Sequence, residues 1–126
     1  MKKYSTVVLL IILSPAFAAD LFDFEKEYDS LALVLPSASG TDRVDLLFEM
    51  ANMLAPWEPK QSQPLADEAF ALASELNYQI GIGKAWQIMA EIAYFNNDYI
   101  KAMDYYNRAV SIFRETDETF IPACIF

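Results

Sequence analysis

Apolar residues recur at three- and four-residue steps over most of the chain, which is the spacing that places them on one face of an α-helix. The first such stripe predicts an amphipathic helix over 21–35, ended by the turn-forming segment 36–40. A second helix follows, with Thr41 or Asp42 as its N-cap, and Pro56 forbids its continuation. Each of these helices needs a neighbour to cover its apolar face.

A proline-rich connector over 56–63 separates these helices from the rest of the chain. Pro64 suits the first turn of a third helix, because its missing N–H would find no partner there in any case. The following residues, 65–76, are rich in helix formers, and Asn77 is a suitable stop. The sequence therefore predicts that the third helix starts at Pro64.

Two further helices complete the pattern. The fourth begins at Gln79 or Ile82, since two nearby glycines leave its start open, and it ends at Phe95. A turn of two asparagines follows, and Asp98 is the predicted N-cap of a long helix over 99–116. No segment alternates apolar and polar residues with period two between turns, so the predicted fold class is all-α.

The N-terminal segment has the pattern of a secretory signal peptide. Two lysines precede an apolar run over 7–13, and small residues occupy the recognition positions Ala16 and Ala18. We predict a signal peptide over 1–18 and an exported mature chain without a membrane span, because the apolar run is shorter than the roughly 18 to 20 residues that cross a bilayer. An uncleaved membrane anchor is the alternative.

The two predicted helix pairs resemble each other at fixed spacings of 39 residues in their first helices and 40 in their second. The aligned residues are Leu47 with Trp86, Met50 with Met89, Ala51 with Ala90, Ala69 with Ala109, and Leu72 with Ile112. One helix pair cannot bury its apolar face alone, so repeated pairs stack into a continuous core. We expect most of these large side chains to be core packing rather than a cofactor site.

The second unit resembles a tetratricopeptide repeat in its residue types and their spacing. The resemblance is carried by Trp86, Met89, Ala90, Asn97, Asp98, Tyr99, Ala102, Tyr106 and Ala109. The upstream unit is a degenerate copy, because Ser62 stands where a small alanine is expected and prolines replace the Asp-Tyr turn. The resemblance implies a short α-solenoid of antiparallel helix pairs, with two pairs over 41–116 and an extra amphipathic helix within 19–40.

The order of segments is also similar to that of exported ectodomains of bacterial sensors and regulators, in which an opening helix and repeats follow a signal peptide. This resemblance implies a periplasmic protein-binding module that works in signal transduction. The apolar tail over 117–126 departs from the pattern, because it carries no third repeat, no membrane span and no output domain. Three explanations stay open: the tail folds back as a cap, it exposes an interface, or the chain is a truncated piece of a larger regulator.

In tetratricopeptide repeats the first helix of each pair lines a concave groove, and the resemblance implies which residues of this chain face it. They are Lys84, Gln87, Glu91 and Tyr94 in the closer copy, and Asp45, Phe48 and Asn52 in the weaker one. Such a groove would hold an extended peptide or a partner helix, with aromatic side chains as anchors. The alternative is that these residues form an ordinary solvated face that binds no ligand. For the protein as a whole, the alternative function is that of a scaffold piece that self-assembles. It would form a homodimer through Phe120 and Ile121 at its C-terminal end.

Composition and charge exclude most catalytic and metal chemistry. The 126 residues include no histidine and one cysteine, Cys124, which removes His-based triads, His-ligated zinc sites and internal disulfides. A net charge of −9 opposes the basic surface that a phosphate backbone requires, so no nucleic-acid partner is expected. Adjacent acidic residues such as Asp67 and Glu68 do not face a common point on a helix. No enzyme activity, cofactor or metal is predicted.

Overall fold

The computed structural model describes residues 15–116, and within them every regular element is helical. The elements are α2 (Pro15–Val34), the short 3-10 helix η2 (Leu35–Ser37), α3 (Gly40–Leu54), α4 (Pro59–Glu75), α5 (Gln79–Phe95) and α6 (Tyr99–Glu115). The all-α prediction is therefore confirmed. Most of the predicted signal peptide and the whole predicted C-terminal tail, with its cysteine, lie outside the described residues.

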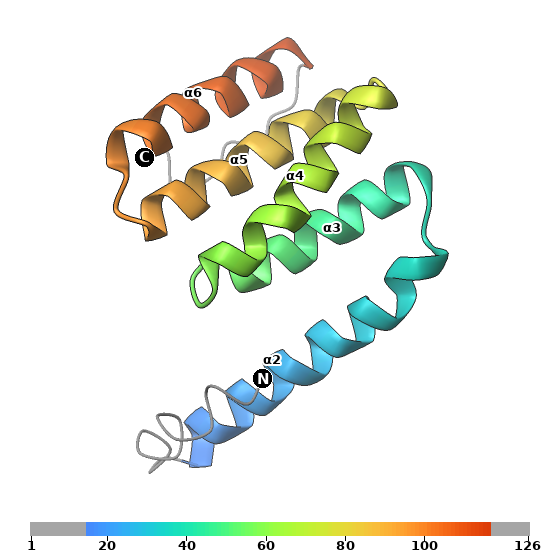
Figure 1. Ribbon diagram of the computed structural model, residues 1–126, viewed down its shortest axis with the longest axis vertical. Helices are drawn as coiled ribbons and strands as arrows, with labels where there is room; N and C mark the ends of the chain where they lie inside the picture. Colours follow the sequence, from blue (N-terminus) through green and yellow to red (C-terminus); the bar gives the residue numbers. More distant parts are fainter. Residues whose placement is uncertain (1–14, 117–126) are drawn as a thin grey trace.

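The helices stack in chain order, and each runs antiparallel to the one before it (Figure 1). The helix α4 packs against both α3 and α5, while α6 packs against α5 and α2 lies against α3. The first helices of the two pairs, α3 and α5, also touch each other directly. The chain thus forms the two predicted helix pairs, α3–α4 and α5–α6, side by side.

The N-terminal helix α2 begins at Pro15 rather than at residue 21, so the predicted cleavage position after Ala18 lies within it. Proline is favoured at the first position of a helix, which explains the early start. None of the described side chains of α2 is buried, and Leu33 is 82% exposed. In the part of the chain that the structure describes, no helix combines the length and apolar character needed to cross a bilayer.

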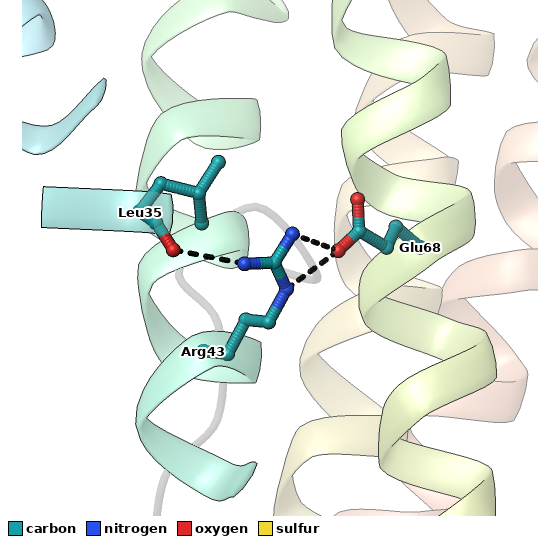
Figure 2. A network of polar contacts seen from close by, with 3 residues as sticks. All are labelled: Leu35, Arg43 and Glu68. Atoms are coloured by element: carbon teal, nitrogen blue, oxygen red, sulfur yellow. Dashed lines mark hydrogen bonds and ion pairs between the residues drawn. The ribbon is translucent and has the colours of Figure 1, made fainter. Parts of the chain in front are cut away.

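One arginine ties the end of α2 to the rest of the stack (Figure 2). Nη1 of Arg43, on α3, donates a hydrogen bond of 2.8 Å to the carbonyl oxygen of Leu35 in η2. Nε and Nη2 of the same guanidinium both lie 2.7 Å from Oε2 of Glu68 on α4. Because guanidinium presents several donors in a fixed plane, one side chain can join η2, α3 and α4.

Two predicted helix starts are wrong. Helix α4 begins at Pro59, and Pro64 lies inside it, so the connector is shorter than the predicted 56–63. Pro59 itself occupies the first turn, where a missing N–H costs nothing, and the cost of the exposed Pro64 is outweighed by packing on both sides of it. Helix α3 begins at Gly40, whose φ of 61° suits glycine, and neither Thr41 nor Asp42 is its N-cap.

The remaining turns follow the prediction. Asn77 and Asn97 adopt positive φ values of 55° and 66°, the left-handed conformation that ends helices and that asparagine tolerates better than most residues. The Asp98 carboxylate accepts a hydrogen bond of 3.2 Å from the backbone N–H of Lys101, which confirms it as the N-cap of α6. Helix α5 begins at Gln79, the earlier of the two predicted starts.

Small residues allow the helices to approach closely, and they do so differently in the two pairs. In the first pair, the buried Ser62 of α4 donates a hydrogen bond of 2.7 Å to the carbonyl oxygen of Ala51 on α3. In the second pair, a Cβ at Gly83 would lie 2.8 Å from the ring of Phe113 on α6, closer than real contacts allow. A side chain at Gly81 would likewise meet Tyr78. Both glycines therefore belong to close contacts of α5.

Three aromatic residues, one of them the predicted core residue Trp86, meet between α4, α5 and α6. The Trp86 ring lies 5.0 Å from Phe70 and 5.3 Å from Tyr105, measured between ring centroids, and the Arg108 guanidinium lies 4.9 Å above it. Such offset and edge contacts are the favoured aromatic geometries. The aromatic cluster around Trp86 is therefore held together by contacts among the chain's own side chains.

Candidate binding surface

The seven predicted groove residues lie on two helices that contact each other. Asp45, Phe48 and Asn52 come from α3, and Lys84, Gln87, Glu91 and Tyr94 come from α5. The start of α3 lies beside the start of α5 and the end beside the end, so the two rows run in the same direction. We call the area they form the α3/α5 surface.

At the starting end of the α3/α5 surface, the charged groups are paired with each other. The Lys84 ammonium lies 3.8 Å from Oδ1 of Asp45 and 5.4 Å from the centroid of the Phe48 ring. The hydroxyl of Tyr78, which precedes α5, donates a hydrogen bond of 2.9 Å to the same Asp45 oxygen. Burial, reinforced by the hydrogen bond to Asp45, raises the pKa of Tyr78 to about 12, so this hydroxyl stays protonated.

In the middle of the surface lies a buried amide. The Gln87 side chain is 8% exposed, and its Oε1 finds no hydrogen-bond partner among the described residues. A hydrogen bond from Gln87 reaches the Glu91 carboxylate one turn later. Burial raises the pKa of Glu91, and this hydrogen bond offsets only part of the effect. Gln87 and Glu91 therefore form a polar pair in which the Oε1 atom of Gln87 is an acceptor without a donor among the described residues.

At the far end of the surface, an open pocket of about 470 Å³ is lined by Asn52, Pro56, Glu91, Tyr94, Phe95 and Tyr106. Its lining comprises three aromatic residues, two of which are tyrosines, together with one proline, one carboxylate and one amide. Tyr94 is 51% exposed, and its ring packs edge-on against Phe95 at 5.4 Å and Tyr99 at 5.5 Å between centroids. This mixture of apolar walls and few polar groups is typical of binding sites.

Three of the predicted residues, Asn52, Glu91 and Tyr94, thus line one pocket, while Asp45, Phe48 and Lys84 form a separate cluster. The pocket also contains residues that the sequence pattern did not single out as binding residues, namely Pro56, Phe95 and Tyr106. Tyr106 appears in the sequence pattern only as one of the residues that carry the resemblance to a tetratricopeptide repeat. Phe95 directly follows Tyr94 at a helix end, and an aromatic pair at such an exposed end is the signal that could have found it.

A smaller pocket of about 170 Å³ lies between α4, α5 and α6, beside Asp98, Lys101 and Tyr105. Its charged groups have partners within the fold, because Asp98 caps α6 and the Lys101 ammonium lies 5.7 Å from the Tyr105 ring centroid. Across the described part of the chain, no three acidic or cysteine side chains gather closely enough to hold a metal ion. The α3/α5 surface is therefore the better candidate for binding.

Comparison of the chain with protein-family models, with curated proteins and with solved structures finds no significant match.

Proposed function

We propose that this protein is an exported helical-repeat module of the tetratricopeptide type, which binds a polypeptide partner on the α3/α5 surface. The observation that carries the proposal is the pocket at the far end of that surface, where three aromatic side chains converge on a half-buried carboxylate. Aromatic side chains in such a pocket are the usual anchors of peptide recognition. The packing of α3 against α5 supports this role, because it brings the exposed Asn52 and Tyr94 to one pocket.

Export to an extracytoplasmic compartment, such as a bacterial periplasm, is the second part of the proposal. It is supported by the lysines, apolar run and small residues of 1–18. The test is expression in a bacterial host, followed by intact-mass measurement of the protein released from the periplasm. We expect a product that lacks 1–18. A full-length product confined to the cytosol would contradict export, without bearing on peptide binding.

A sensory ectodomain of a signalling protein is the context that the segment order favours.

Peptide binding is testable with a displayed library of random peptides about eight residues long. An extended chain of that length, at ~3.3 Å per residue, exceeds the roughly 15 Å from Lys84 to Tyr94 along α5. We expect recovered peptides to bind the native protein and to lose about tenfold or more in affinity for Tyr94→Ala, because an aromatic anchor is removed. The control variant is Leu33→Ala on α2, which also removes an exposed apolar side chain. Equal binding to both variants would contradict the assignment of this surface.

A second candidate function, self-assembly as a scaffold, is favoured by the outer face of α6. Ile100 is 88% exposed and Met103 is 67% exposed, one turn apart on the same face. Self-assembly predicts a dimer in light scattering that Ile100→Lys together with Met103→Lys converts to a monomer. A native protein that is monomeric at high concentration would rule this candidate out.

A further inference from the structure

Glu91 is a half-buried carboxylate that has no cationic partner among the described residues. No lysine or arginine among the described residues forms an ion pair with it, and its hydrogen bond comes from the neutral amide of Gln87. Two of its neighbours in the pocket are aromatic residues of the same helix, Tyr94 and Phe95, and a third, Tyr106, comes from α6. A half-buried charge that lacks a counter-charge is costly, so the fold maintains this arrangement at the expense of stability.

The other end of the α3/α5 surface shows that the chain can pair such charges. There, the Asp45 carboxylate has both the Lys84 ammonium and the Tyr78 hydroxyl as partners. Lys84 stands seven residues before Glu91, which is about 10 Å along a helix, and it is engaged with Asp45 and the Phe48 ring. The unpaired carboxylate is therefore confined to the end of the surface that has the open pocket.

We propose that the partner segment carries a lysine or arginine whose cationic group occupies this pocket beside Glu91, with its alkyl stem against the aromatic walls. This inference rests on the proposed peptide-binding function and specifies its ligand. A cation gains from both the carboxylate and the faces of the surrounding rings. Lysine and arginine are also donor-only groups, which suits a pocket whose carboxylate, Glu91, can accept further hydrogen bonds besides the one from Gln87.

Charge complementarity selects this occupant over the alternatives. An acidic side chain would be repelled by Glu91, and a neutral apolar one would desolvate the carboxylate further without compensating it. The net charge of −9 also favours the approach of a basic segment. The exposed ring of Tyr94 offers the surface along which the alkyl stem can pack.

The test uses a peptide recovered from the random library whose binding depends on Tyr94. In a matched set, its basic residue is replaced by norleucine, which keeps the stem without the charge, or by glutamate. We expect the norleucine peptide to bind the native protein about tenfold or more weakly, and to bind Glu91→Gln as well as the parent peptide does. Glu91→Lys should reverse the preference and favour the glutamate peptide.

Glu75→Gln on α4 is the matched control, because it removes the same charge from an exposed position outside the pocket. It should retain the full difference between the parent and norleucine peptides. Denaturation of Glu91→Gln should show a protein at least as stable as the native one, which separates loss of binding from loss of folding. Recovered peptides that depend on Tyr94 but show no preference for a basic residue would overturn this inference alone. If no recovered peptide depends on Tyr94, the proposed function fails and the inference fails with it.

Discussion

The helix pairs α3–α4 and α5–α6 both consist of antiparallel helices in contact, but they distribute side-chain volume in opposite ways. In the first pair, Val44 of α3 and Ala73 of α4 belong to one buried cluster. At the corresponding positions of the second pair, 39 and 40 residues later, stand Gly83 of α5 and Phe113 of α6, which are in direct contact. The large and small partners have changed places between the helices. At these positions the two pairs therefore fill their cores with different combinations of large and small residues.

Differences between corresponding residues of the two pairs also account for the pocket at the far end of the α3/α5 surface. The residue that corresponds to Tyr94 in the first pair is the buried Ala55, and the residue that corresponds to Glu91 is Asn52. The large aromatic ring and the carboxylate are thus found only in the second pair, where Tyr106 of α6 joins them. The two pairs provide two similar rows of positions, and their differences in chemistry place the aromatic rings and the carboxylate of this pocket in the second pair.

The largest expected effect comes from making the second pair resemble the first. Gly83→Val should lower the free energy of unfolding by about 2 kcal/mol or more, because the added atoms overlap the Phe113 ring. Phe113→Ala alone should cost roughly 3 kcal/mol through the cavity that it leaves. The double variant recreates the Val44 and Ala73 arrangement, so its loss should be smaller than the sum of the single losses by about 1 kcal/mol or more.

Urea denaturation of the four proteins measures this coupling, with Ala71→Val on the exposed side of α4 as the control for adding a branched side chain to a helix. The control should change stability by less than about 1 kcal/mol. Losses that simply add in the double variant would show that the two contacts are not equivalent.

The second effect concerns the hydrogen bond that is specific to the first pair. Ser62→Ala should lower the free energy of unfolding by about 1 kcal/mol, because it removes the buried bond from Ser62 to the Ala51 carbonyl. Ser74→Ala, at an exposed position of the same helix, makes the same substitution without such a bond and should be nearly neutral. The measurement is the thermal unfolding midpoint of both variants. Indistinguishable midpoints would mean that the buried hydrogen bond contributes nothing to stability.

A third substitution tests the N-cap that is specific to the second pair. Asp98→Ala should cost about 1 kcal/mol, because the backbone N–H of Lys101 loses its acceptor at the start of α6. At the start of α4 the N-cap residue makes no side-chain cap bond, so the first pair lacks this contribution. Hydrogen exchange at the amide of Lys101 gives a direct measurement, and unchanged protection in the variant would contradict the role of the cap.

The smallest effect appears in alkaline solution. The pKa of Tyr78 is about 12 in the folded protein against 10.0 for an unperturbed tyrosine, so the folded state holds this proton more tightly than the unfolded state. The stability contributed by Tyr78 is therefore fully present below pH 10 and declines as the pH rises from 10 towards 12. The stability advantage of the native protein over Tyr78→Phe should shrink across this window, as followed by urea denaturation. An advantage that does not change with pH would show that the hydroxyl titrates normally.

How far the sequence predicts the fold depends on how local the signals are. The ends of α4 and α5 and the cap of α6 were predictable, because Asn77, Asn97 and Asp98 act through their own backbone and nearest neighbours. The start of α4 was not, because two prolines compete for the first turn. Pro64 is accepted inside the helix through packing, such as that of Ser62 against α3, which no local pattern reveals.

The candidate site also has features that the sequence could predict and features that it could not. The resemblance to tetratricopeptide repeats implied which residues of α3 and α5 line a groove, and the structure places Asp45 beside Lys84 and brings Asn52, Glu91 and Tyr94 to one pocket. The resemblance could not predict that Lys84 pairs with Asp45 while Glu91 has no cationic partner among the described residues. That difference depends on the relative positions of two helices and on Tyr106 from a third. The Arg43 network at the end of α2 was missed for the same reason, because it joins three separate elements.

The most direct test of the central claim is to map where a selected peptide contacts the isotopically labelled protein, by following backbone amide shifts during a titration. If the α3/α5 surface binds the partner, the largest changes will fall on Asn52, Glu91, Tyr94 and Tyr106 around the pocket. The aromatic cluster around Trp86 will then change little. Changes centred on Trp86 and Tyr105 instead, with the pocket residues unaffected, would contradict the account.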